Sequence, residues 1–316
     1  MKGPLRIVFF GTPDFATTSL EAIYHSSHEI VGVVTATDKA GGRGQRLKES
    51  SVKIFAKNHG LPVFQPENLK EEHFIHQITA LKADVFVVVA FRMMPKILFE
   101  IPPLGTFNLH GSLLPDYRGA APINFAIING EKETGVTTFF INEKMDEGNI
   151  LLQEKLEIFS DEDAGSLHDR MMVLGAQTIL KTLEGLRNNS LKEKPQPKVS
   201  NVKKAFKIYR EDTRINWDRP SDAVYNFVRG LSPFPVSFTT LSIEGEEKDL
   251  KIYSGKPEKV FHKVKPGTLE FTKKMCKIYT QDGVFYPEEL QLEGKKRVGV
   301  RDFINGLQSF ENIFIV

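Results

Sequence analysis

The stretch Leu-Arg-Ile-Val-Phe-Phe-Gly-Thr-Pro occupies residues 5–13. An apolar run of this length that stops at a glycine is typical of a strand buried on both faces of a parallel sheet. Thr12 can cap a helix and Pro13 suits the first helical position, so the stretch predicts a helix over 14–25. Another apolar run follows at 30–35. This β-α-β beginning predicts an α/β fold with an open, Rossmann-like sheet.

The same alternation continues further along the chain. Strands are expected over 85–90 and 134–141, and the first of these is the most apolar, which predicts a central position in the sheet. Further helices are expected over 51–59, 69–82, 122–129 and 163–187. The last helix is long enough to cover one face of the sheet.

A polar segment divides the chain. Residues 189–207 include Pro195, Pro197 and several lysines, a composition typical of a linker between domains 1–188 and 208–316. In the second domain a helix is expected over 221–230. Short apolar segments then alternate with turn residues, at 236–243, 250–253, 267–271, 276–280, 283–286 and 289–292. These segments predict a smaller β-barrel of the OB type.

The composition is that of a globular protein. The chain has 316 residues, with 41% hydrophobic and 26% charged side chains, which is enough for two domains with apolar cores. The single cysteine, Cys276, cannot form an internal disulfide, so a reducing compartment is expected. The sequence has neither an apolar run of about 18 residues nor a signal peptide. We therefore expect a cytoplasmic protein without a membrane segment.

Charge is distributed unevenly. Residues 1–189 carry 19 Lys/Arg and 23 Asp/Glu, whereas 190–316 carry 23 and 17. A glycine-rich loop at 38–48 is also basic, as is a predicted turn near the C-terminus; their cationic residues are Lys39, Arg43, Arg46, Lys48, Lys295, Lys296 and Arg297. Such groups can bind a phosphate backbone. An ordinary solvated surface accounts for the same charges, and that alternative stays open.

The strongest candidates for catalytic residues lie on and just after one predicted strand. In Phe-Asn-Leu-His-Gly-Ser-Leu-Leu-Pro, residues 107–115, Asn108 and His110 are two apart and lie on one face of a strand. An amide donor beside an imidazole suits acyl-type transfer. Asp146, in a turn after the next strand, could orient the ring. The alternatives are a histidine bound to a backbone carbonyl and an aspartate that only forms a turn.

Other chemistries lack their motifs. The first strand is followed by Gly-Thr-Pro-Asp and not by G-x-G-x-x-G, and no Walker A pattern occurs, so NAD chemistry is not expected. The histidines have no metal-ligand spacing, so no metal is expected. Phe91 and Arg92, after the central strand, could form a rim for a flat ligand or belong to the core.

Several motifs resemble those of one known family. The chain is similar to methionyl-tRNA formyltransferases, within the folate-dependent formyltransferase family, along nearly its whole length. The matching stretches are Phe-Gly-Thr-Pro-Asp-Phe-Ala (10–16), Ala-Gly-Gly-Arg-Gly-Gln-Arg (40–46), Gly-Leu-Pro-Val-Phe-Gln-Pro (60–66), the 107–115 stretch, Tyr-Arg-Gly-Ala-Ala-Pro-Ile (117–123), Met-Asp-Glu-Gly-Asn-Ile (145–150), Ser-Pro-Phe-Pro (232–235) and Gly-Lys-Lys-Arg (294–297).

The resemblance implies a specific reaction. A formyl group passes from 10-formyltetrahydrofolate, the co-substrate, to the amino group of methionine on initiator tRNA, for translation initiation. Asn108, His110 and Asp146 would be catalytic: Asn108 and a protonated His110 would hold the oxyanion, while Asp146 orients the ring and takes a proton. The folate-contacting residues would be Ser112, Leu113, Leu114, Pro115, Phe91 and Arg92. The basic loop would bind tRNA, with Arg43 its main contact, and the chain is expected to be a monomer.

The sequence departs from the commonest family pattern in three places. Residues 145–149 read Met-Asp-Glu-Gly-Asn where Leu-Asp-Thr-Gly-Asp is more usual, Phe91-Arg92 replaces Tyr-Gly, and Asp116 replaces a basic residue. Two other functions stay open. One is formyl transfer to a nucleotide sugar or small amine, and the other is a non-catalytic RNA-binding protein on the same scaffold.

Overall fold

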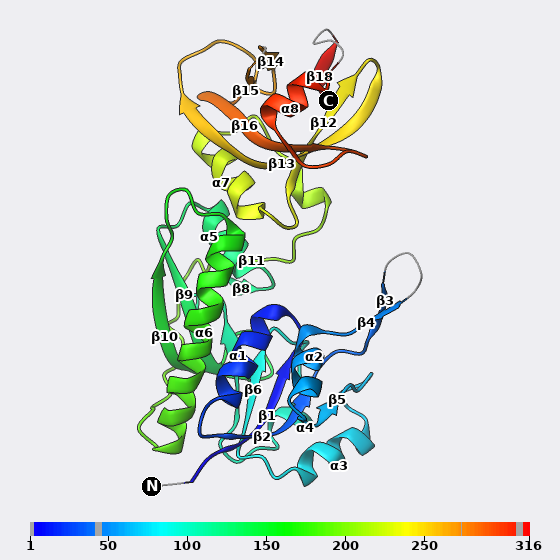
Figure 1. Ribbon diagram of the computed structural model, residues 1–316. Coiled ribbons are helices and arrows are strands. Elements are labelled where there is room, and N and C mark those ends of the chain that lie inside the picture. Colours follow the sequence, from blue (N-terminus) through cyan, green and yellow to red (C-terminus); the bar gives the residue numbers. More distant parts are fainter. Residues whose placement is uncertain (1–2, 42–45, 273, 308–311) are drawn as a thin grey trace. The chain divides into compact units, whose positions relative to one another are not determined.

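The chain folds into two compact units (Figure 1). The computed structural model describes residues 3–41, 46–272, 274–307 and 312–316. The units are interleaved along the sequence. The first unit contains Met1–Gly119, Thr134–Glu157 and His168–Lys204, and the second contains Ala120–Glu133, Ile158–Leu167 and Ala205–Val316. The domain limits taken from composition stay predictions.

The first unit is built on an open sheet in the order β10-β9-β7-β6-β1-β2-β5. Its core strands pair in parallel, whereas β9 runs antiparallel to β7. The strand bounds are β1 Arg6–Gly11, β2 Glu29–Val34, β5 Val63–Phe64, β6 Val85–Val89, β7 Thr106–His110, β9 Glu133–Phe140 and β10 Ile150–Glu157. The predicted Rossmann-like sheet is therefore confirmed, and β6, buried along its whole length, lies between β7 and β1.

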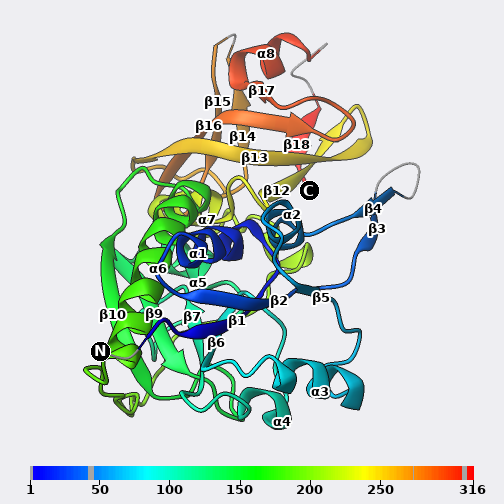
Figure 2. The same ribbon diagram turned by 60° about the horizontal axis from the view of Figure 1, so that its bottom comes forward.

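Helices cover both faces of this sheet, because successive side chains of a buried strand point to opposite sides. Val8 and Phe10 of β1 join an apolar cluster with residues of α3 and α4. On α1 and α6, which lie side by side (Figures 1 and 2), the rings of Phe15 and His168 are 5.2 Å apart. The helix bounds are α1 Asp14–Tyr24, α2 Ser51–Asn58, α3 Glu72–Ala80, α4 Lys96–Phe99 and α6 Ala164–Arg187.

Two strands of the first sheet lie outside the ranges that the sequence predicts. Strand β5 has two residues, which is too short for any periodicity to appear. Strand β10 is an edge strand whose outward positions carry charged and polar residues, so its apolar signal is weak. The predicted loop at 38–48 also contains a short antiparallel ladder, β3 (Lys39–Gly41) with β4 (Arg46–Lys48).

The second unit is a nearly closed antiparallel barrel, which confirms the predicted smaller C-terminal barrel. Its strands follow the order β14-β15-β16-β13-β12-β18, and β17 pairs with β16. The strand bounds are β12 Ser237–Ile243, β13 Glu246–Lys259, β14 Leu269–Phe271, β15 Cys276–Tyr279, β16 Gly283–Leu292, β17 Val298–Gly299 and β18 Ile313–Ile315. The helices are α5 Pro122–Ile128, the 3-10 turn η1 Glu211–Thr213, α7 Ser221–Leu231 and α8 Val300–Asn305. The short strands β8 (Arg118–Gly119) and β11 (Lys204–Ala205) lie where the chain passes between units.

The predicted break between 283–286 and 289–292 is wrong, because β16 continues through Pro287. This proline pairs with Gly255 at a shift in the register of β13. A proline lacks an N–H group, and a bulge in the partner strand removes the need for one. The helix α8 and the strand β18 lie outside the predicted elements as well.

A buried histidine makes the stability of the first unit depend on pH. Nδ1 of His28 accepts a hydrogen bond from the backbone N–H of Leu5 at 3.2 Å, and Nε2 lies 3.4 Å from Glu184. Burial lowers the pKa of His28 below its ordinary value, and Arg187 acts in the same direction against the opposing effect of Glu184. The folded chain therefore keeps this ring neutral at a pH where the unfolded chain protonates it.

We expect the wild-type chain to lose stability as the pH falls below about 6.5, the ordinary value for histidine, by up to about 1 kcal/mol per pH unit. The stability from a depressed histidine pKa is fully present above that pH and is lost as the pH falls towards the folded-state pKa. The check is thermal unfolding by circular dichroism at several pH values, for the wild type and for His28→Asn, which keeps an acceptor for Leu5. Parallel pH curves for the two proteins would contradict this prediction.

Candidate active site

Strand β7 brings two of the expected catalytic side chains together. Asn108 and His110 lie on one face of β7, between β6 and β9 in the sheet. Asn108 is half-buried, and its Oδ1 atom is buried without a hydrogen-bond partner among the described residues. Buried polar atoms are rarely left unpaired, so this oxygen is available to a hydrogen-bond donor on a bound molecule.

The His110 ring lies between a carbonyl and a carboxylate. It is 6% exposed, and its Nε2 is 2.8 Å from the carbonyl oxygen of Tyr117. A carbonyl oxygen only accepts, so Nε2 carries a hydrogen and Nδ1 is the nitrogen available for chemistry. Nδ1 is 3.9 Å from Oδ2 of Asp146. The hydrogen bond to a backbone carbonyl therefore accounts for Nε2, while Nδ1 faces the carboxylate of Asp146.

Asp146 is held in place by its neighbours. Its Oδ2 accepts a hydrogen bond from the backbone N–H of Gly119 at 3.0 Å, and its side chain is 14% exposed. Asp146 has φ +54° and Tyr117 has φ +61°, the left-handed region that non-glycine residues rarely adopt. Strained residues cluster at functional sites. The two residues that face the His110 ring are both of this kind.

The turn after β7 is fixed partly by Thr137 and Gln153, which the sequence does not single out. The Ser112 hydroxyl donates to the Asp116 carbonyl at 2.6 Å, and Thr137 of β9 donates to the Ser112 carbonyl at 2.6 Å. Gln153 of β10 donates to the Leu114 carbonyl at 2.8 Å. These contacts depend on the pairing of β7, β9 and β10, so no local sequence motif predicts them.

Only part of this turn presents side chains to a ligand. Ser112 and Leu114 are buried, whereas Leu113 and Pro115 are half-buried. A ligand at this turn would therefore contact the side chains of Leu113 and Pro115 and, at the buried positions, the backbone.

Phe91 and Arg92 form one packed group beyond β6. The Phe91 ring packs edge-on against Phe10, with centroids 5.7 Å apart, and the Arg92 guanidinium lies 5.8 Å from the Phe91 centroid. Arg92 also donates to the backbone carbonyl of Glu67 at 2.7 Å. Phe91 therefore belongs partly to the core, and Arg92 is exposed above it.

The structure describes only some of the residues that are expected to bind tRNA. Arg43 and the side chains of Lys39 and Arg46 lie outside the described residues, while Lys48 is exposed. In the second unit Lys295, Lys296 and Arg297 are exposed in the turn after β16. Arg297 forms an ion pair with Glu289 and lies 4.1 Å from the ring centroid of Tyr253.

A lysine on α2 fixes the base of the basic hairpin. Lys53 forms ion pairs with Asp38 at 2.5 Å and with Glu49 at 3.1 Å, the residues that flank β3 and β4. The hydrogen bond from Lys53 lowers the pKa of Asp38 and raises that of Lys53. Both ends of the hairpin are therefore tied to one helix.

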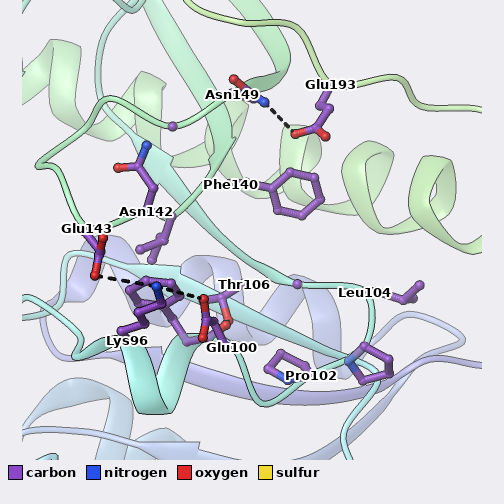
Figure 3. Close-up of a pocket in the computed structure, with 15 residues that line it drawn as sticks. Lys96, Glu100, Pro102, Leu104, Thr106, Phe140, Asn142, Glu143, Asn149 and Glu193 are labelled. Atoms are coloured by element: carbon purple, nitrogen blue, oxygen red, sulfur yellow. Dashed lines mark hydrogen bonds and ion pairs between the residues drawn. The ribbon is translucent and has the colours of Figure 1, made fainter.

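A cavity of about 630 Å³ lies at the opposite end of β7 (Figure 3). Its lining includes Thr106, the first residue of β7, whereas His110 is the last. Lys96 lies 3.8 Å from both Glu100 and Glu143 in it, and Asn149 donates to Glu193 at 2.9 Å. This cavity does not include Asn108, His110 or Asp146.

Comparison with known families agrees with this geometry. The family model of the formyl transferases matches residues 5–183, and that of the formyl transferase C-terminal domain matches 207–308. The chain belongs to the formyl transferase family. Like its relatives below, it is a formyl-transferring enzyme, and the resemblance predicted from the motifs is confirmed.

Two curated relatives are similar along almost their whole length. A methionyl-tRNA formyltransferase of Flavobacterium johnsoniae is 46% identical over 303 residues, which cover 96% of each chain. Another, of Parabacteroides distasonis, is 44% identical over 314 residues and 97% of each chain. These identities make the chain similar to methionyl-tRNA formyltransferases in both units.

A solved structure supports the fold of this formyl transferase. A sugar 3N-formyl transferase, crystallised in the presence of dTDP and 5-N-formyl-THF, matches 92% of this chain and 99% of its own, with a TM-score of 0.67 and 22% identity. In the described part of the chain, no helix has the length and apolarity to cross a membrane.

Proposed function

We propose that the chain transfers a formyl group from 10-formyltetrahydrofolate to the amino group of methionine on initiator tRNA, for translation initiation. The observation that carries this is the grouping of Asn108, His110 and Asp146, with Nδ1 of His110 3.9 Å from Asp146 and the amide oxygen of Asn108 without a partner in the described part of the chain. The identity with methionyl-tRNA formyltransferases along both units supports the acceptor.

Each of the three side chains has a role in this reaction. The amine attacks the formyl carbon, and the formyl oxygen gains negative charge. The Nδ2–H of Asn108 and the Nδ1–H of protonated His110 donate to that oxygen, and Oδ1 of Asn108 can accept a hydrogen bond from the attacking amine. Asp146 orients the ring and accepts the proton that the amine gives up. The bond from the formyl carbon to the folate nitrogen then breaks, and that nitrogen takes a proton.

The proposed co-substrate site uses the turn after β7. Leu113 and Pro115 offer partly exposed apolar side chains there, and Phe91 with Arg92 would line the rim above β6. Such a combination of apolar surface and a few polar groups suits a flat folate ring. The basic hairpin at 38–48 and the turn at 295–297 would bind the phosphates of the tRNA.

The test is transfer of a labelled formyl group from 10-formyltetrahydrofolate with methionine-charged initiator tRNA as acceptor. Uncharged tRNA and a nucleotide amino sugar serve as parallel acceptors. Label on the charged tRNA alone is the expected result. Label on the sugar would keep the catalytic grouping and overturn the tRNA acceptor, and tRNA binding without transfer would favour the non-catalytic alternative.

Replacing Arg43 by alanine is expected to raise the KM for charged tRNA by about tenfold, because one phosphate contact is lost, and to reduce the slope of affinity against salt by about one. The KM for the folate should stay unchanged. Steady-state kinetics at several salt concentrations would check this, with the exposed Lys70→Ala as the charge-matched control. Equal KM values for tRNA in both variants would remove Arg43 from the interface.

A further inference from the structure

Gln196 lies in the polar segment 189–207, yet its side chain reaches the turn that carries Asp146. Its Nε2 donates to the backbone carbonyls of Asp146 at 2.8 Å and of Gly148 at 2.9 Å. Its Oε1 accepts from the guanidinium of Arg118, at 2.6 Å from Nη2 and 3.2 Å from Nε. Both amide hydrogens and the amide oxygen are therefore engaged.

The backbone around Gln196 is fixed in register with the first unit. Ile150 and Lys194 exchange two backbone hydrogen bonds, of 2.7 and 2.8 Å. Asn149 donates to Glu193 at 2.9 Å, as Figure 3 shows. Among residues 192–200, Gln196 is half-buried and its neighbours are exposed. This segment therefore runs along the start of β10, and in this position the side chain of Gln196 points to the turn that carries Asp146.

The Asp146 turn needs such support. Asp146 has φ +54°, a conformation that is strained for a residue other than glycine and persists only where several contacts enforce it. Gly119 holds its carboxylate, and Gln196 holds its carbonyl. The next residue, Glu147, forms an ion pair with Arg118 at 3.0 Å. Arg118 therefore contacts both Gln196 and the turn that carries Asp146.

We propose that Gln196 is a positioning residue for formyl transfer. Its carboxamide holds the strained Asp146 turn so that the carboxylate faces Nδ1 of His110, and it ties Arg118 and Glu147 into the same arrangement. This inference rests on the proposed function, in which Asp146 acts on His110. It gives the segment that follows α6, which belongs to the first unit, a part in the reaction.

Two variants separate the contacts of Gln196. Gln196→Met removes all of them at nearly constant volume. Gln196→Glu keeps an acceptor for Arg118, removes both donors and brings a carboxylate against two carbonyl oxygens. Both should lower kcat by about ten- to a hundredfold with little change in the KM for folate or tRNA, because a misplacement of about 1 Å at a reacting group costs this much. The exposed Gln77→Met on α3 should leave kcat unchanged.

A double-mutant cycle with Asp146→Asn tests whether Gln196 acts through Asp146. If it does, Gln196→Met should cause little further loss of kcat in the Asp146→Asn chain, because groups that act as a unit are not additive. The melting temperature of every variant is measured by circular dichroism.

Three results would overturn the inference. They are a lower melting temperature with unchanged kcat in Gln196→Met, a wild-type kcat in Gln196→Glu, and fully additive losses in the cycle. In each case an inactive Asp146→Asn leaves the proposed function standing. An Asp146→Asn chain with full activity would remove Asp146 from the mechanism, and this inference with it, whereas a wild-type chain that transfers no formyl group to charged tRNA would overturn the proposed function.

Discussion

Replacing His110 by alanine is expected to lower kcat for formyl transfer by about a thousandfold, within the range that a positioned acid or base contributes. The ring is buried, and Nε2 makes its hydrogen bond to the Tyr117 carbonyl while the other ring nitrogen faces Asp146. Alanine removes the donor to the developing oxyanion and the group that Asp146 orients. The measurement is the rate of transfer from 10-formyltetrahydrofolate to charged initiator tRNA at saturating concentrations of both.

Two further variants show whether a loss of activity in His110→Ala comes from the reaction or from misfolding. His110→Gln offers an N–H group towards the Tyr117 carbonyl and lacks Nδ1, so it should be folded and as inactive as the alanine variant. His76→Ala, on the exposed surface of α3, should have wild-type activity. A His110→Ala chain within about twofold of the wild-type kcat would remove this residue from the mechanism, since general acid–base groups contribute about a hundredfold or more.

The second large effect is expected from Gly148→Ala. A Cβ atom built on Gly148 would lie 1.6 Å from the backbone oxygen of Phe140 and 2.8 Å from its carbonyl carbon. The oxygen cannot retreat easily, because the neighbouring N–H of Phe140 donates to the carbonyl of Asn149 at 2.9 Å and fixes the strand against the turn. The turn that carries Asp146 must therefore move.

We expect Gly148→Ala to lower kcat by more than tenfold and the free energy of unfolding by about 2–4 kcal/mol, as overpacking against rigid backbone does. Kinetics and thermal unfolding check the two parts separately. The control is Gly299→Ala, at φ −67°, where the nearest atom to an added Cβ is 4.0 Å away. Wild-type kinetics and stability in Gly148→Ala would show that the turn at 145–149 does not constrain the site.

Much of the first unit could be predicted from local sequence because its strands are buried on both faces. After Arg6, the run that forms β1 is buried at every position, as is the whole of β6, and such apolar runs are visible without any knowledge of their neighbours. The common face of Asn108 and His110 is equally local, since it follows from the two-residue repeat of a strand. Edge strand β10 lacks this signal, because its polar outer positions match many structures.

The assembly around His110 depends on contacts between distant parts of the chain. β9 ends opposite Phe107, and the turn that follows it places the Asp146 carboxylate 3.9 Å from Nδ1 of His110. Gln196 meets this turn from 50 residues further on. Local propensity carries no information on these distances, which are set by strand pairing and by the burial of the sheet. The amino-acid pattern therefore determines the strands and the pair Asn108 and His110. Folding in three dimensions supplies the carboxylate, the strained turn and the glutamine that holds it.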